Sequence, residues 1–227
     1  MDRNLGAMDI FYHGKDGLHD GDLYYQFGRK DPFSGPRRIY IRKEDGIYSF
    51  ETWSASTYTI PNTTADVNCN NVPYSIQHPL VFIKGKSSYW TYNDKYNPKE
   101  YESKIRWQDP YVMDGMGKSM FDPCPFGWKT PEKDTWTGFT TSNFLWNNPL
   151  SPGRNDPKSS AFYPASGFLT SDSCGFVYVG SYGMYWSCNP QSSDQRIKHL
   201  WFDSGSNVGQ SYIGYRSCGL PVRCVLE

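Results

Sequence analysis

The chain has 227 residues, which suits one large domain or two small ones and can bury a core without metals or disulfides. Its 23 Lys and Arg residues balance 23 Asp and Glu residues, which excludes the basic stripe of a nucleic-acid groove. Aromatic residues make up 17% of the chain, including 18 Tyr, beside 21 Gly and 16 Pro. This composition favours strands and turns over helices, and tyrosine is also a common contact residue at binding surfaces.

The first half begins with a predicted short helix over about 21–29, in "DGDLYYQFGRKDPF", capped by Asp20 or Asp22 and closed by Gly28. Between the turn signals of 34–106, apolar runs predict strands at 37–43, 47–53 and 79–85. The His- and Asp-rich segment 13–22 could hold a metal, but such clusters are more typical of turns and helix caps. We therefore predict no metal site there.

The second half holds the clearest helix start, with Thr130 at the N-cap, Pro131 at N1 and Glu132 in the first turn. This pattern predicts a helix over about 131–139. A loop-rich stretch follows at 147–162, and strands are predicted at 176–180, 184–187, 198–204 and 221–226. Because no linker interrupts the chain, we predict a single α+β domain over residues 1–227.

The ends of the sequence bear on its location. No apolar run approaches the roughly 20 residues that span a bilayer. The first residues have neither the positive region nor the hydrophobic core of a signal peptide. We expect either a cytosolic protein or one that lacks its leader. The final Leu226-Glu227 is typical of a cloning junction, and we assign it no function.

Catalytic motifs are missing from the sequence. It has no G-x-S-x-G elbow, phosphate loop, dinucleotide fingerprint or H-E-x-x-H pair, and segment 92–97 lacks the register of a calcium loop. On these grounds a binding module is favoured over an enzyme.

Six cysteines allow three bridges and 15 pairings, and none lies in a C-x-x-C motif that would indicate zinc. Cys218 and Cys224 cannot pair if the segment between them is extended, because they would lie about 20 Å apart, beyond the roughly 7 Å limit. Each needs a partner elsewhere, and the residues alone leave that partner open.

Several phrases in a fixed order carry a resemblance. They include "LYYQFGRKDPF" (23–33), "DPCPFGWKTP" (122–131), "YPASGF" (163–168), "GMYWSC" (183–188) and the final "YRSCGLPVRCV". In this order the chain resembles the major paralogous (FISUMP-type) domain family of bacterial surface proteins. The resemblance implies a C-type-lectin-like α+β fold with two helices around a twisted, mostly antiparallel sheet. It also implies export, as part of a lipoprotein or a pilus, and relatives among the variable proteins of diversity-generating retroelements.

The resemblance also implies structural roles. Cys124 and Cys224 match the family's two recurrent cysteines and are expected to form a disulfide. Closing this loop of about 100 residues is worth up to roughly 4–5 kcal/mol on the chain-entropy model. Trp128 and Trp186 match framework positions and are expected in the core. Arg223 is expected as a buried or half-buried hydrogen-bonding anchor.

The ligand face is expected at the carboxy-terminal surface, about 188–218. In "IKHLWFDSG", alternation turns Leu200 and Phe202 inward and their neighbours outward. The following stretch 207–217 is predicted as a loop. The expected ligand-binding residues of a protein or glycan site are Lys198, His199, Trp201, Asp203, Asn207, Gln210, Tyr212, Tyr215 and Ser217. Trp201 could instead cover a neighbouring loop or another part of a longer protein.

Other interpretations of the function and of the cysteines stay open. The sugar-binding triplet of calcium-dependent lectins is absent, and we expect no cofactor. Cys188 and Cys218 could pair with each other or with Cys69 and Cys174, or stay free. A relative of the formylglycine-generating cysteine oxidases is the second hypothesis, and a purely structural surface module is the third. Adenine-directed diversification can produce Tyr212 but not Trp201, so it also remains open.

Overall fold

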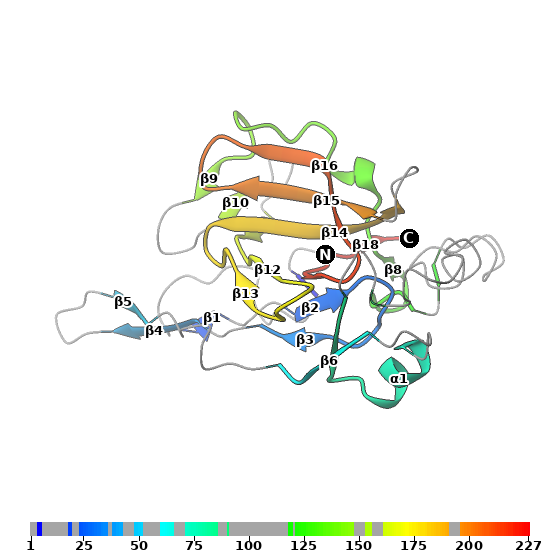
Figure 1. Cartoon of the computed structure of the whole chain (residues 1–227). Coiled ribbons are helices and arrows are strands. Elements are labelled where there is room, and N and C mark those ends of the chain that lie inside the picture. The colour runs from blue at the N-terminus through cyan, green and yellow to red at the C-terminus, as the bar shows by residue number, and fades with distance from the viewer. Residues whose placement is uncertain are drawn as a thin grey trace.

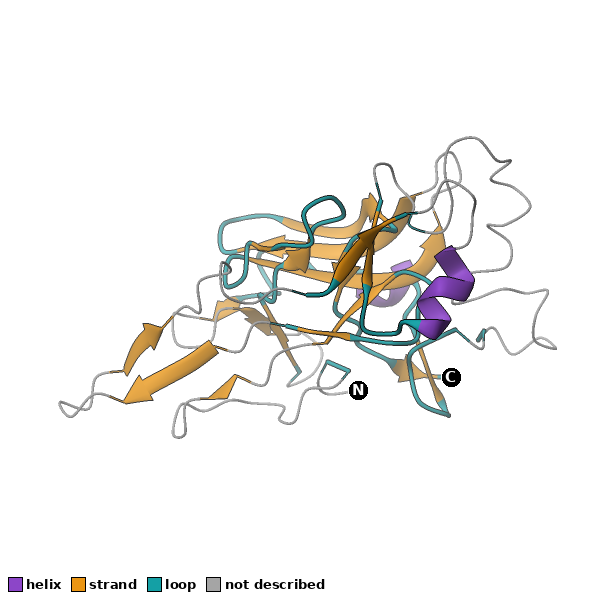
Figure 2. Cartoon of the chain, turned by 60° about the horizontal axis from the view of Figure 1, so that its bottom comes forward, coloured by secondary structure: helices purple, strands orange, loops and turns teal. Residues whose placement is uncertain are grey.

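The computed structural model describes residues 4–5, 18–19, 23–35, 38–42, 48–51, 60–65, 71–85, 90, 118–119, 121–147, 153–155, 161–190 and 196–227. The fold is mixed α+β with little helix, and its strands pair mostly antiparallel (Figures 1 and 2). Within these ranges, every helix is too short or too polar to traverse a bilayer.

Two sheets contribute residues to the three largest core clusters. A five-stranded sheet has the order β13 (Phe176–Val177), β12 (Phe168–Leu169), β17 (Gly219–Leu220), β2 (Leu23–Gln26) and β3 (Phe33–Ser34). A three-stranded meander contains the longest strands, β14 (Tyr182–Pro190), β15 (Arg196–Asp203) and β16 (Val208–Tyr215). These three strands lie one above the other in the upper half of Figure 1, with β2 and β12 below them.

Smaller ladders and two short helices complete the described part. They are β11–β10–β9 (Phe162–Pro164, Gly153–Asn155, Trp146–Asn147), β1–β4–β5 (Leu18–His19, Arg38–Arg42, Tyr48–Glu51) and β18–β8 (Val225–Leu226, Trp128–Lys129). The parallel pair is β6 (Asn62–Thr64) with β7 (Phe82–Lys84). The helices are α1 (Asn71–Gln77) and the 3₁₀ turn η1 (Lys133–Trp136).

The predicted helix over 21–29 is wrong, because Leu23–Gln26 form strand β2. β2 lies inside the five-stranded sheet, between β17 and β3. Tyr24 and Tyr25 point into different core clusters on its two faces. A strand that is buried on both faces has no polar alternation, so its apolar run also fitted a helix. Gly28, with φ 88°, closes a turn after the strand.

The second predicted helix is reduced to a single 3₁₀ turn. Its N-cap is Glu132, whose side chain makes no cap bond, whereas Thr130 is fully buried. The Thr130 backbone N–H donates to Asp122 at 3.0 Å, so the expected capping residue is held in another network. Trp136 is buried, and Gly138 reverses the chain with φ 92°. In the described part of the chain, the α-helix α1 lies where turns were expected.

The carboxy-terminal half follows the predicted strands with three differences. Segments 184–187 and 198–204 lie in β14 and β15, as predicted. In contrast, 176–180 and 221–226 each contribute only two strand residues. The stretch predicted as a loop contains β16, which pairs along most of β15. Its Gly- and Ser-rich composition hid the strand, since these residues are typical of turns.

Strand β14 is buried on both faces. The neighbouring residues Tyr185 and Trp186 are fully buried on opposite sides of the strand. Tyr185 packs with Leu200 and Phe202, and the Trp186 indole N–H donates to the Tyr25 carbonyl at 2.8 Å. Trp186 is therefore a core residue, as the resemblance implies.

A disulfide joins the two cysteines that the resemblance singles out. Cys124 and Cys224 are bridged, with 5.9 Å between their Cα atoms, which is the expected pairing. The neighbouring Arg223 is buried, donates to the Phe162 carbonyl and to Asn4, and lies 4.0 Å from the Tyr163 ring centroid. Trp128 is half-buried and packs against the same core cluster. These residues fix the last segment of the chain on the fold.

Candidate functional site

The turn between β15 and β16 uses two of the predicted ligand residues for structure. The Asp203 carboxylate accepts hydrogen bonds from the backbone of Gly205 (2.9 Å) and Asn207 (3.2 Å) and from the Asn207 side chain (2.7 Å). Arg154 donates to the Asp203 and Gly205 carbonyls, at 3.0 and 2.7 Å. Asp203 and Asn207 therefore form the hairpin turn, and their polar groups are already engaged.

An aromatic row crosses one face of the meander. Tyr178 and Tyr182 stack with 4.3 Å between centroids, and Trp201 and Tyr212 stack at 5.4 Å. Tyr182 meets Trp201 edge-on at 5.8 Å, which joins the two pairs. Tyr178 is 53% exposed and Tyr212 is 52% exposed, while the two inner rings are half-buried. We call Tyr178, Tyr182, Trp201 and Tyr212 the aromatic row.

The outer end of the row is held by its backbone. Tyr178 has φ 57°, a left-handed conformation that costs a non-glycine residue roughly 1–2 kcal/mol. Its carbonyl accepts from the backbone N–H groups of Ser181 and Tyr182, each at 2.9 Å. Gly167 packs directly beneath, where a Cβ atom would lie 2.2 Å from the Val177 carbonyl. Such strain persists only where the surroundings impose it, and it is most common at functional sites.

His199 lies inside the molecule, so its predicted outward orientation is wrong. The side chain is 2% exposed and meets Trp186 and Tyr212 edge-on. Both faces of β15 are covered, and its register with β16 shifts between His199 and Trp201. Leu200 and Phe202 do alternate with His199, but the face that carries His199 is covered as well, by Trp186 and Tyr212. Burial lowers the pKa of His199 to about 4, against a smaller opposing effect of the Ile197 backbone.

A pocket opens beside Tyr212. Its volume is about 240 Å³, and it is lined by Phe168, Met184, Arg196, His199, Tyr212, Ile213, Gly214, Tyr215, Cys218 and Leu220. Tyr215 is 49% exposed at this pocket. Three of the predicted ligand residues therefore meet at one cavity, and a fourth, Trp201, stacks on its wall residue Tyr212.

The remaining predicted ligand residues lie elsewhere. Gln210 donates from Nε2 to the Phe139 carbonyl at 2.6 Å, which ties β16 to the segment after η1. Ser217 is fully buried, and its carbonyl accepts from Gln26 Nε2 at 3.0 Å, so it lies in the core rather than at the pocket. Lys198 is half-buried and lies outside the pocket lining.

The described cysteines outside the disulfide are free and buried: Cys174, Cys188 and Cys218. Cys188 and Cys218 belong to the same core cluster but form no bridge, which answers the question left open by the sequence. Burial raises the pKa of Cys188 to about 12 and that of Cys218 to about 11. A buried thiol with a raised pKa is a poor nucleophile. Cys69 lies outside the described residues.

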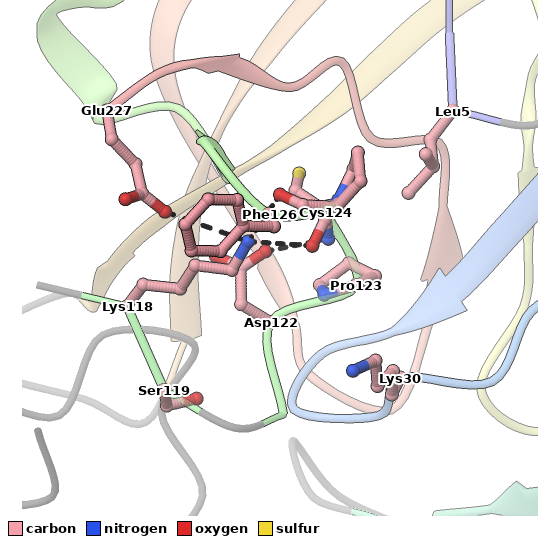
Figure 3. A pocket seen from close by; sticks show the side chains of 10 residues that line it. Leu5, Lys30, Lys118, Ser119, Asp122, Pro123, Cys124, Phe126 and Glu227 are labelled. Carbon is pink, nitrogen blue, oxygen red and sulfur yellow. Dashed lines mark hydrogen bonds and ion pairs between the residues drawn. The ribbon is translucent and has the colours of Figure 1, made fainter.

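A second, larger pocket of about 460 Å³ lies near the disulfide, beside the 96% exposed Phe126 (Figure 3). Its main charged groups are already satisfied. The Lys118 ammonium donates to the carbonyls of Cys124 and Pro125 at 2.7 Å and to that of Trp128, and it pairs with Glu227 at 3.8 Å.

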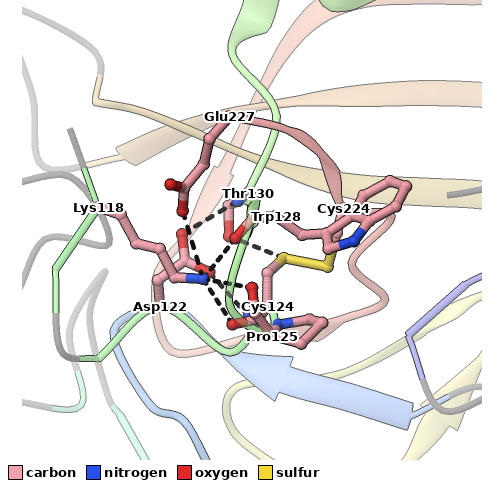
Figure 4. A network of polar contacts seen from close by, with 8 residues as sticks. All are labelled: Lys118, Asp122, Cys124, Pro125, Trp128, Thr130, Cys224 and Glu227. Carbon is pink, nitrogen blue, oxygen red and sulfur yellow. Dashed lines mark hydrogen bonds and ion pairs between the residues drawn. A yellow bond between two sulfur atoms is a disulfide. The ribbon is translucent and has the colours of Figure 1, made fainter. Parts of the chain in front are cut away.

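Asp122 completes this polar network (Figure 4). Burial raises the pKa of its carboxyl above the ordinary value, while hydrogen bonds from the Thr130 and Cys124 backbone oppose the shift. The network holds the loop that carries Cys124. We therefore assign this region a structural role and take the aromatic row with its neighbouring pocket as the candidate site.

Sequence reasoning missed Tyr178 and Tyr182, which stand before the expected ligand surface. The run "FVYVG" (176–180) is predicted as a strand, and only the structure shows that Tyr178 and Tyr182 stack beside Trp201. The available signal was the two tyrosines four residues apart, with glycines beside a tight turn.

Comparisons with known proteins give no independent guide to this site. No protein-family model matches the chain, and neither curated proteins nor solved structures yield a match. The class of protein therefore has to be argued from the site.

Proposed function

We propose that the chain is a non-enzymatic recognition domain of a bacterial cell surface, which binds a protein or glycan through the aromatic row. The observation that supports this most is the contact of four aromatic rings along one face. Aromatic side chains give large contact areas at low conformational cost, and they dominate the energetics of interfaces.

The rigidity of the row supports binding further. Tyr178 is held in a costly backbone conformation, and Tyr182 and Trp201 are half-buried among neighbours. A surface that is ordered before contact loses less entropy when a ligand binds. The FISUMP-type resemblance adds the cell-surface setting, on a lipoprotein or at a pilus tip.

The described thiols favour this proposal over a cysteine oxidase. An oxidase of the formylglycine-generating type needs an accessible, reactive pair, whereas Cys188 and Cys218 are buried with raised pKa values. Thiols of this kind are typical of core packing.

The test is a binding screen on glycan and extracellular-protein arrays with the wild-type chain and a Trp201→Ala/Tyr212→Ala variant. A matched control is Phe126→Ala, because Phe126 is an exposed aromatic residue in a different part of the fold. The proposal expects hits that the double variant loses and the control keeps. Hits that bind both variants equally would place the ligand surface elsewhere.

A further inference from the structure

The pocket beside Tyr212 combines a largely apolar wall with the deeply buried His199 and with Arg196, which is half-buried and already engaged with another group. Phe168, Met184 and Leu220 line it together with His199. Among the described atoms, neither ring nitrogen of His199 has a hydrogen bond of good geometry, although the Ile197 backbone lies close enough to act on its pKa. Leaving a buried polar group unpaired is costly, and buried polar side chains usually have a partner. An imidazole in this position therefore suits a group that enters the pocket.

The chemistry of His199 limits the kind of ligand group that can enter the pocket. Its pKa of about 4 keeps the imidazole neutral near pH 7. A neutral imidazole offers one N–H donor and one bare nitrogen acceptor. A single O–H or N–H group on the ligand can pair with the bare nitrogen, without any need for ligand charge.

The volume of the pocket and the residues of its wall limit the ligand further. Whole-ligand pockets usually measure roughly 300–1,000 Å³, so about 240 Å³ suits one ring better than an extended molecule. Tyr212 and Phe168 offer aromatic surfaces, and the Met184 thioether packs well against ring edges. A sugar ring would bring several hydroxyl groups against the apolar part of the wall, where Phe168, Met184 and Leu220 offer no hydrogen-bond partners in place of water.

We infer that this pocket binds a single aromatic ring carrying one O–H or N–H group, a phenol or an indole, with His199 as the polar contact. The ring arrives either as a free small molecule or as a Tyr or Trp side chain of a partner protein. A Tyr or Trp side chain of a partner would extend the recognition function proposed above, and this part of the inference rests on that function. Binding of the ring itself does not rest on it.

The experiment follows His199 directly. The chain is labelled with ¹⁵N-histidine, and the His199 ring signals are assigned by their loss in His199→Phe. The probes are p-cresol, indole, toluene and methyl glucoside. We expect p-cresol and indole to shift the His199 signals saturably. Toluene lacks the polar group and is expected to bind about 5–10-fold more weakly. Methyl glucoside is expected to shift nothing.

Variants separate ring binding from folding, with binding read by saturation transfer to p-cresol. His199→Gln keeps a donor and an acceptor and is expected to keep part of the binding, whereas His199→Phe removes both groups and the preference for p-cresol over toluene. Phe126→Ala is the matched control and should bind p-cresol normally. If His199→Phe does not fold, the toluene comparison and His199→Gln still decide the outcome.

Three results would overturn the inference. One is no shift of His199 by p-cresol or indole up to about 10 mM, well above a weak dissociation constant of 1 mM. Another is equal binding of toluene, and the third is a response to methyl glucoside alone. If a Tyr-containing peptide displaces p-cresol and the same peptide with Phe does not, the ligand is a side chain of a partner protein. If p-cresol binds and neither peptide displaces it, the ligand is a free small molecule. If array binding still depends on Trp201 and Tyr212, only this inference has failed and the proposed function stands.

Discussion

Tyr178 and Tyr182 lie face to face, with ring planes 11° apart and centroids at 4.3 Å, although Tyr178 has the left-handed backbone φ of 57°. A tight turn of three residues, 179–181, joins the two tyrosines. The Tyr178 carbonyl accepts both turn N–H groups, and Gly167 packs beneath the turn without a side chain. The backbone of the turn therefore holds the two rings together, and substitutions in this turn should destabilise the fold.

Gly167→Ala is expected to destabilise the fold by more than about 2 kcal/mol. Its φ is 65°, and the added Cβ would lie 2.2 Å from the Val177 carbonyl and 2.7 Å from the Val179 nitrogen. Urea unfolding measures the loss. Gly127→Ala is the control, because φ there is 76° with nothing within 4 Å of the new Cβ, and about 1 kcal/mol is expected. Equal losses at both sites would contradict the close packing under Tyr178.

Removing the disulfide with Cys124→Ala/Cys224→Ala is expected to cost about 4 kcal/mol. The bridged cysteines are separated by 100 positions, so the bridge strongly restricts the unfolded chain. Chemical unfolding of the oxidised protein and the double variant measures the difference. A loss under about 1 kcal/mol would mean that the bridge adds little to the hydrogen bonds of Arg223 and Asp122.

The three described free thiols are expected to resist alkylation in the native protein. Cys174, Cys188 and Cys218 are buried, and burial raises the pKa of each, so little thiolate forms near pH 8. Peptide-resolved mass spectrometry after iodoacetamide treatment reads each site, and the same treatment in denaturant should label all three. Rapid native labelling of Cys188 or Cys218 would revive the cysteine-oxidase hypothesis.

His199 is expected to make the fold less stable in mild acid. The unfolded chain binds a proton at this residue below pH about 6.5, but the folded chain does so only below about 4. Unfolding therefore takes up a proton between these values. Stability should fall by up to about 3 kcal/mol as the pH drops from 6.5 to 4, and then level off.

Comparison with His199→Phe isolates this effect, because both proteins keep Asp122, whose raised pKa acts in the opposite direction. Urea unfolding between pH 4 and pH 7.5 should give parallel curves above pH 6.5 and diverging curves below it. Curves that stay parallel throughout would show that the folded state does not hold His199 neutral.

The sequence predicted the strands that carry clear apolar runs, whereas the core position of Trp186 was implied by the resemblance. It also indicated Trp201, Tyr212 and Tyr215, because aromatic residues beside polar ones are typical of contact surfaces. It could not predict β2, since burial on both faces removes the alternation that distinguishes a strand. Nor could it place His199, whose burial depends on the cover over both faces of β15. The Cys124–Cys224 pairing came from the resemblance, as spacing alone left it open.

The central claim is that the aromatic row binds the ligand. Its most direct measurement is the affinity of the first array hit for the wild type, Trp201→Ala/Tyr212→Ala and Phe126→Ala, with folding checked by circular dichroism. Residues that anchor an interface contribute 2 kcal/mol or more, so the double variant should bind at least about 30-fold more weakly while Phe126→Ala binds normally. An affinity of the double variant within about twofold of the wild type would contradict the account.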